Sequence, residues 1–307
     1  MGGGRMGADD WDRYSTTHIT GKTTAGIYTS SSIDSNLDPK GVSVRESCDS
    51  EDNPESTAVI AALDVTGSMS DVLEAVAKNL GVMVSELYDR KPITDPHLMF
   101  MGIGDAYMGD KYPLQVTQFE ADIRIAEQLQ KIYFERGGGG NDCESYTLAW
   151  YFAAMKTKID CFEKRGKRGI LFTMGDEEPN MNLTVGEIQT VIGDQPQKDY
   201  TAEELLEMVS KQYEVFHLII EEGSHAKYHR GEVVKKWTGL LGQHAIPVSD
   251  CTKIAEVMVS VMQAIGGEDK DKIISSWDGD TSLVVSKAID GIVKSDGSPS
   301  SSGVVEL

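Results

Sequence analysis

Three oxygen-bearing side chains stand at alternate positions where the first strongly apolar run of this sequence ends. The run 57-TAVIAALDVT-66 contains Asp64 and Thr66, and Ser68 follows after a glycine. Side chains at positions i, i+2 and i+4 of an extended segment lie on one side of it. One carboxylate and two hydroxyls can therefore converge on one point. Such oxygens are the ligands that Mg²⁺, Ca²⁺ and Mn²⁺ prefer, so the spacing predicts a site for a divalent cation.

These three groups alone bind a cation poorly, so we expect further oxygens from other segments. Asp176 follows the apolar run 169-GILFTMG-175 and is expected at the end of a neighbouring strand. Asn141 and Glu144 follow the glycine run 137-GGGG-140, and either can supply the remaining oxygen. Glu144 is slightly favoured because it stands near the start of the next helix.

Other acidic residues near these positions have a simpler interpretation. Asp105 and Asp110 are expected either at the same rim or in a solvated loop. Glu177 and Glu178, directly after Asp176, are expected to lie in a solvated loop beyond the ligand.

The segments that carry these residues alternate between two kinds of pattern. Apolar runs indicate buried strands, and apolar residues at helical spacing indicate helices. Strands are expected at 57–66, 97–104, 113–120, 169–175, 214–222 and 245–249, and helices at 71–88, 122–133, 145–157, 202–213, 231–242 and 252–265. Strands that alternate with helices predict a doubly wound α/β domain, with a mainly parallel sheet and helices on both faces. Ligands bind such sheets at the carboxyl ends of the strands.

Composition divides the chain into three parts. Residues 1–56 are rich in Gly, Ser, Thr and Asp, and we expect a partly irregular N-terminal arm. The α/β domain is expected over 57–266. Residues 267–307 are expected to form a flexible acidic tail, in which 281–292 can form a short amphipathic helix.

The charge of the chain narrows the classes of partner. With 29 Lys and Arg against 49 Asp and Glu, the formal charge is −20. Nucleic acids and anionic membranes require clustered positive charge, so neither is expected as a partner. Long apolar runs and a secretory leader are not evident, and the four cysteines show no metal or disulfide spacing. A cytoplasmic protein is the expectation.

Asp64-Val65-Thr66-Gly67-Ser68-Met69-Ser70 resembles the first motif of the von Willebrand factor A (vWA) domain family, and Asp176 after Gly175 resembles its third. That family holds a metal at its metal-ion-dependent adhesion site. The resemblance covers roughly residues 57–265. It implies a metal ion, Mg²⁺ or else Ca²⁺ or Mn²⁺, held by Asp64, Thr66, Ser68 and Asp176. The second motif departs from the family pattern, because Asn141 or Glu144 stands where a threonine is common.

The resemblance implies a non-catalytic protein-binding module whose partner supplies an acidic residue to the metal. Intracellular members include adaptors and assembly factors, among them partners of AAA+ ATPases.

Two alternatives stay open. The string Asp64-Val65-Thr66-Gly67-Ser68 also resembles the haloacid dehalogenase type of Mg²⁺-dependent phosphotransferase, in which Asp64 would be the nucleophile. Two observations oppose this phosphotransferase interpretation. No convincing lysine motif follows in the sequence, and the glycine run would have no role in such an enzyme. The second alternative is a structural vWA-like protein whose metal site has degraded.

Overall fold

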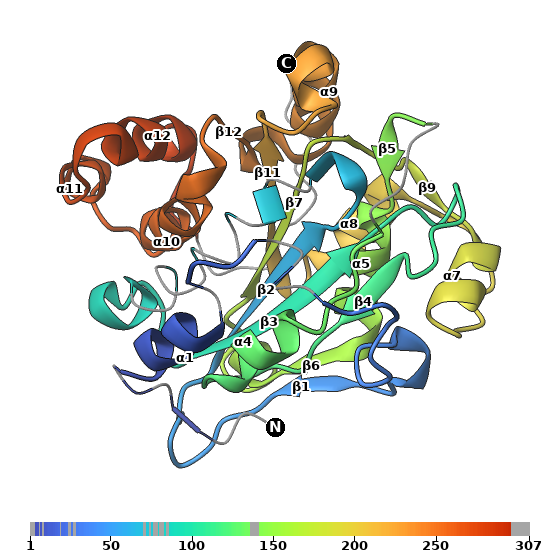
Figure 1. The fold of residues 1–307 in the computed structure, drawn as a ribbon, viewed down its shortest axis with the longest axis horizontal. Helices are drawn as coiled ribbons and strands as arrows, with labels where there is room; N and C mark the ends of the chain where they lie inside the picture. Colours follow the sequence, from blue (N-terminus) through green and yellow to red (C-terminus); the bar gives the residue numbers. More distant parts are fainter. Residues whose placement is uncertain are drawn as a thin grey trace.

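The computed structural model describes residues 4–5, 7, 9–18, 20–23, 26, 29–69, 72–73, 75, 79, 83, 86–135 and 141–295. Its centre is a six-stranded sheet in the order β12-β11-β7-β2-β3-β4 (Figure 1). The strands are β2 (Thr57–Asp64), β3 (Pro96–Ile103), β4 (Leu114–Val116), β7 (Gly169–Gly175), β11 (Tyr213–Ile220) and β12 (Ala245–Val248). All neighbours are parallel except β3 and β4. The expected doubly wound α/β fold is therefore confirmed.

Helices cover both faces of this sheet, and β2 shows why. Val59, Ala61 and Leu63 enter one apolar cluster, and Ala58 and Ile60 enter the other. The first cluster packs against α4 (Arg124–Leu129), α10 (Ile254–Ile265), α11 (Lys270–Ser275) and α12 (Gly279–Ile289). The second packs against α5 (Tyr146–Lys156), α7 (Val185–Val191), α8 (Ala202–Val209) and α9 (Ala226–Leu241). A strand buried on both faces explains the continuous apolar run in the sequence.

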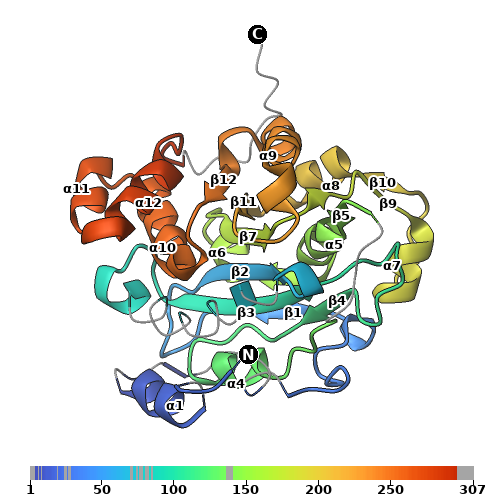
Figure 2. The same ribbon diagram turned by 45° about the horizontal axis from the view of Figure 1, so that its top comes forward.

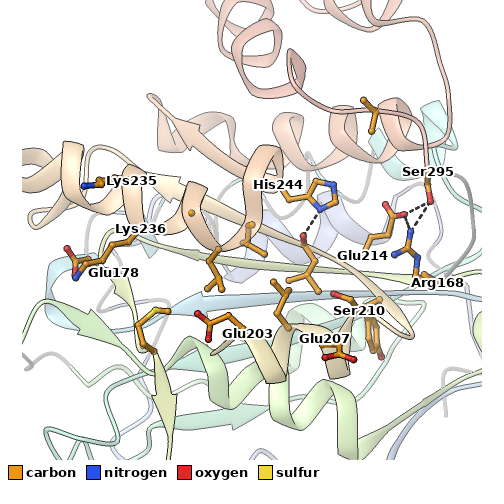
Figure 3. A pocket seen from close by; sticks show the side chains of 18 of the residues that line it. Arg168, Glu178, Glu203, Glu207, Ser210, Glu214, Lys235, Lys236, His244 and Ser295 are labelled. Atoms are coloured by element: carbon orange, nitrogen blue, oxygen red, sulfur yellow. Dashed lines mark hydrogen bonds and ion pairs between the residues drawn. The ribbon is translucent and has the colours of Figure 1, made fainter. Parts of the chain in front are cut away.

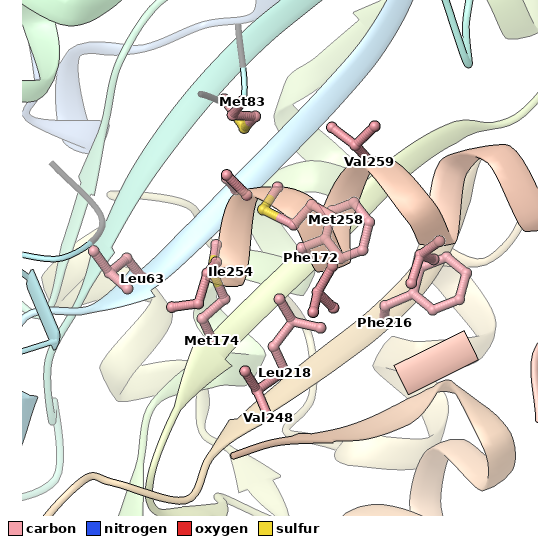
Figure 4. Close-up of a cluster of buried hydrophobic side chains, with 14 of the residues drawn as sticks. Leu63, Met83, Phe172, Met174, Phe216, Leu218, Val248, Ile254, Met258 and Val259 are labelled. Carbon is pink, nitrogen blue, oxygen red and sulfur yellow. The ribbon is translucent and has the colours of Figure 1, made fainter. Parts of the chain in front are cut away.

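The first cluster is the larger one, and α10 lies at its centre. Met258 of α10 packs among side chains of β7 and β11, including Phe172 and Leu218 (Figure 4). All twelve residues of α10 are buried. This helix must therefore be covered on its outer side as well as on the sheet side.

That outer cover contradicts the expectation of a flexible tail from residue 267. Helices α11 and α12 pack on α10, and Ile273, Val285, Ile289 and Ile292 are buried in the same cluster. Apolar residues at helical spacing allow this segment to fold onto a buried helix. The expected helix at 281–292 corresponds to α12, and the rest of the predicted tail, residues 296–307, lies outside the described part.

The N-terminal segment is attached to the body by a short parallel strand pair. β1 (Arg45–Ser47) pairs with β6 (Thr157–Ile159), and the Ser47 hydroxyl lies 3.1 Å from Nδ1 of His97. Farther toward the N-terminus, α1 (Asp10–His18) packs Trp11 and Tyr14 against the first cluster. Figure 2 shows α1 and α4 below the sheet.

Several elements differ from the sequence expectations. The strand expected at 113–120 is shorter and antiparallel, and α9 begins at Ala226 rather than at 231. α7 was not expected, although Thr184 and Glu187 form a capping box at its start. Two pairs of two-residue strands also form. β5 (Cys143–Glu144) pairs with β8 (Glu178–Pro179), and β9 (Asn182–Leu183) pairs with β10 (Tyr200–Thr201). α6 (Asp160–Glu163) precedes β7.

The described residues of the segment expected as a helix at 71–88 are helical, although part of it is not described. None of the described helices is long and apolar enough to cross a membrane.

The packing of α12 gives a stability prediction. Ile289→Ala should lower the free energy of unfolding by about 2–5 kcal/mol, because it leaves a cavity against α10. Leu283 lies on the same helix but is 62% exposed, so Leu283→Ala should change stability by less than about 0.5 kcal/mol. Urea denaturation of both variants measures the difference, and equal effects would show that α12 does not belong to the core.

Candidate metal centre

Asp64 ends β2 and is fully buried. Its Oδ1 accepts two hydrogen bonds from Thr66, one from the backbone N–H at 2.9 Å and one from the hydroxyl at 2.7 Å. The Thr66 hydroxyl lies 3.2 Å from that of Ser68, in the 3₁₀ turn η2 (Gly67–Met69). The structure therefore brings together the carboxylate and two hydroxyls that the alternate spacing predicts.

Asp176 reaches this group from the neighbouring strand. It follows β7, which pairs in parallel with β2, as the sequence predicts. The Ser68 hydroxyl donates to its Oδ1 at 2.9 Å, and the backbone N–H of His225 donates to its Oδ2 at 2.7 Å. Gly223 permits this approach, because a Cβ added at Gly223 would lie 2.2 Å from the Cβ of Asp176, which is too close for two carbon atoms.

The chain diverges in two directions at this point of the sheet. From β2 it continues to β3 on one side, and the later strands β7, β11 and β12 lie on the other. Asp64 and Asp176 therefore stand at the topological switch point, where doubly wound sheets bind their ligands.

Tyr146, the first residue of α5, is a partner that the sequence analysis missed. It is fully buried, and its hydroxyl donates to Oδ2 of Asp64 at 3.3 Å. A Cβ at Gly175 would lie 1.9 Å from this hydroxyl oxygen, so only glycine leaves room for it. The sequence contained a signal, the glycine that ends the strand before Asp176.

Glu144 is the second-loop residue that faces this group. Strand β5 pairs with β8, which follows Asp176, and this pairing places Glu144 beside Pro179. The side chain is 2% exposed, and its Oε2 has no hydrogen-bond partner among the described residues. A buried carboxylate oxygen without a partner is costly, and a bound ion is one way to satisfy it.

The electrostatic surroundings of Glu144 are acidic. Burial raises the pKa of its carboxyl far above the ordinary value, and the nearby charges of Asp64, Glu177 and Asp105 raise it further. Burial and the charge of Asp176 likewise raise the pKa of Asp64. The pKa of Glu177 rises to about 8, again through burial first and then through Asp64 and Asp176. The carboxyls of Glu144, Asp64 and Glu177 are thus harder to ionise than they would be in water.

Asn141 lies at the edge of the group. Its amide donates to Oδ2 of Asp105 at 2.7 Å and lies 3.4 Å from the sulfur of Cys143. Among the described residues it forms no hydrogen bond with Asp64 or Asp176, whereas the charge of Asp64 acts on Glu144. The glycine run 137–140 that precedes it lies outside the described residues.

The loop after Asp176 is not solvated as expected. Glu177 and Glu178 are 7% and 5% exposed, because β8 turns back to pair with β5. The Glu177 carbonyl accepts a hydrogen bond from the indole N–H of Trp237, and the Glu178 carboxylate pairs with Lys236. Asp105 is also buried, and its Oδ1 accepts from the backbone of Tyr107.

The oxygens gathered here are of the kind that hard divalent cations prefer. Asp64, Asp176 and Glu144 carry carboxylates, and Thr66 and Ser68 carry hydroxyls. In the described part of the chain, no three His, Cys, Asp or Glu side chains lie close enough to form a metal site by themselves, so the three acids do not form one without the hydroxyls.

Comparisons with known proteins give distant similarities in fold. No family model matches the chain, and no curated protein matches it in sequence. The pilus adhesin SpaC from Lactobacillus rhamnosus GG, in an open conformation, is 11% identical with a TM-score of 0.43. That similarity covers 74% of this chain and 31% of the adhesin, so the chain spans about a third of the adhesin's length.

Two further solved structures are similar. Another form of SpaC has 11% identity and a TM-score of 0.46, over 70% of this chain and 32% of the adhesin. The conserved hypothetical protein BatB from Bacteroides thetaiotaomicron has 17% identity and a TM-score of 0.31, over 53% of this chain and 66% of BatB.

The raised pKa values predict how stability depends on pH. Without divalent cations, the free energy of unfolding should fall as the pH rises from 4.5 toward 8, because folded Glu177 keeps a proton that the unfolded chain has released. One group of this kind lowers the free energy of unfolding by about 1.4 kcal/mol per pH unit within this range. Saturating Mg²⁺ should remove this part of the decline, because the cation stabilises the ionised carboxylates.

Urea denaturation in EDTA and in Mg²⁺ measures both curves. Glu177→Gln should reduce the decline in EDTA, whereas Glu51→Gln in an exposed loop should not. Equal declines in the two variants would exclude Glu177 as its source.

Proposed function

We propose that this chain is a vWA-like, non-catalytic protein-binding module that holds Mg²⁺, or else Ca²⁺ or Mn²⁺. The ligands would be Asp64, Thr66, Ser68, Asp176 and Glu144, with Asn141 at the edge of the site. The observation that carries the proposal is the buried Glu144 carboxylate, whose Oε2 has no partner among the described residues. A divalent cation would offset the repulsion among these acids and fill the missing contact.

Coordination chemistry supports a role in recognition. A cation held by carboxylates and hydroxyls can keep a position open, which the carboxylate of a partner protein can occupy. The vWA resemblance of the Asp64–Ser70 motif supports this role, and an AAA+ ATPase is one class of partner that it implies.

The hydrogen bonds of Asp64 support binding over phosphoryl transfer. Both oxygens of its carboxylate accept hydrogen bonds, from Thr66 and Tyr146, and these bonds make the carboxylate a weaker nucleophile.

Calorimetric titration with Mg²⁺ and Mn²⁺ tests the metal site. The EDTA-stripped wild type should give metal-dependent heat, and Asp64→Asn should weaken binding at least about tenfold by removing one charged ligand, about 1.4 kcal/mol. Glu144→Gln should weaken it in the same direction.

The matched control is Asp250→Asn. Asp250 caps a turn after β12, at the same edge of the sheet, and its Oδ1 accepts from Thr252. This variant should bind as the wild type does. A wild type that gives no heat would contradict the metal-dependent function and favour a degraded site.

Recognition of a partner requires a separate experiment. Affinity capture in Mg²⁺ and in EDTA, with wild type and Asp64→Ala side by side, should reveal a protein that is retained only by the metal-loaded wild type. The circular dichroism spectrum of Asp64→Ala should match that of the wild type. Substitution of the captured protein's acidic residues should then abolish its retention, and retention that is insensitive to EDTA would contradict the mechanism.

A further inference from the structure

A long groove lies between α8 and α9, on the side of β11, and one end of it, at Asp142 and Glu178, adjoins the segments that carry the candidate metal ligands. We call this the α8–α9 groove. It extends from Glu178 and Lys236 at one end to Arg168 and Ser295 at the other (Figure 3). Its volume of about 1470 Å³ exceeds the roughly 300–1,000 Å³ that is typical of sites for small molecules. The size indicates a polypeptide segment as the occupant.

The walls and floor of the groove are largely apolar. Val215 of β11 contributes to the floor, and Leu206 of α8 and Leu240 of α9 line opposite walls. Leu206 and Leu240 are only half-buried, and Met181 at the rim is 41% exposed. An occupant with an apolar face would remove these side chains from water.

The charged residues of the groove are predominantly acidic. Of the six carboxylates that line it, Glu178 pairs with Lys236 and Glu214 pairs with Arg168 at 2.5 Å. Four carboxylates then face two lysines, Lys235 and Lys294. Glu203 and Glu207 form no ion pair within the part of the chain that the structure describes, and Asp142 lies near the pair of Lys236 with Glu178. The net charge of −20 adds to the negative potential, so the groove favours a cationic occupant.

Gly239 marks the point where a side chain on α9 would enter the groove. It lies within α9 and lines the groove, and a Cβ added there would meet no atom of the described residues within 4 Å. A bulky side chain at this position would therefore occupy space that the groove offers to a ligand, whereas glycine leaves the α9 backbone open to it.

We propose that the α8–α9 groove binds a basic amphipathic segment of a partner protein. The apolar face of the segment packs on Leu206 and Leu240 and against the backbone at Gly239. Its Lys or Arg side chains lie near Glu203 and Glu207. This binding does not require the metal, and it provides a second contact for a partner already held at Asp64 and Asp176.

A designed peptide tests the groove without a known partner. The probe is a fluorescent helical peptide as long as α9, 16 residues, with Leu on one face and Lys on the other. Its twin carries Glu in place of every Lys. Fluorescence anisotropy in EDTA, at physiological ionic strength, should show binding of the Lys peptide and at least tenfold weaker binding of the Glu peptide. Because EDTA removes the metal, this result is independent of the proposed metal site.

Two glycines of α9 provide a matched pair of variants. Gly239→Leu should weaken binding of the Lys peptide at least tenfold, because its side chain fills the groove, and should leave the melting temperature unchanged or higher. Gly231 lies in the same helix outside the groove, again with no atom within 4 Å of a Cβ, so Gly231→Leu should bind as the wild type does. Glu207→Lys should weaken binding several-fold, and Glu51→Lys, with the same change of charge, should not.

Four results would overturn the proposal. The first is that the Lys peptide does not bind. The second is that Gly239→Leu and Gly231→Leu change the affinity equally, and the third is that the Lys and Glu peptides bind with equal affinity. The fourth is evidence that something other than a partner protein fills the groove. A dimer in sedimentation that Gly239→Leu dissociates would identify a second copy of the chain, and binding only after deletion of 296–307 would identify the chain's own C-terminal segment.

Discussion

The candidate site is dominated by one constraint, the burial of several acidic side chains close together at one edge of the sheet. Asp64, Glu144, Asp176 and Glu177 are all less than 10% exposed, and burial makes each ionised form costly. Hydrogen bonds from Thr66, Ser68 and the His225 backbone satisfy part of this requirement, but they bring no full positive charge. A fold optimised for stability alone would place apolar or paired residues there. The arrangement is therefore best explained by a function that uses the charge.

The surrounding fold holds these acids close together by removing side chains elsewhere. Gly175 and Gly223 leave the space that the Tyr146 hydroxyl and Asp176 occupy, and a Cβ at either would overlap them. Tyr146 packs edge-on against His217 and Trp237, whose rings stack with centroids 3.4 Å apart. The Tyr146 hydroxyl that binds Asp64 is thus held by a group of packed aromatic rings.

Much of the fold and half of the site could be predicted from sequence, for local reasons. The run 57–66 is buried on both faces, so its apolar pattern is continuous, and the spacing of Asp64, Thr66 and Ser68 follows from the geometry of one strand. Glu177 and Tyr146 could not be predicted in this way. Glu177 is buried by the pairing of β5 with β8, and Tyr146 reaches Asp64 across 82 positions in sequence. The helix α12 was expected, but α11 and the packing of both helices on α10 were missed, because that packing depends on α10 being buried beneath them.

Helix α9 links the two proposed binding surfaces. The backbone of His225, just before its first turn, donates to Asp176, whereas Gly239 near its other end lines the groove. His229 between them has non-helical angles, φ −118° and ψ 19°, so α9 is kinked there and its two halves need not move together. Two contacts tie the groove half of α9 to the loop after Asp176, namely the hydrogen bond from Trp237 to the Glu177 carbonyl and the ion pair of Lys236 with Glu178. Any energetic coupling between the two proposed binding surfaces should therefore depend on these contacts more than on the helix itself.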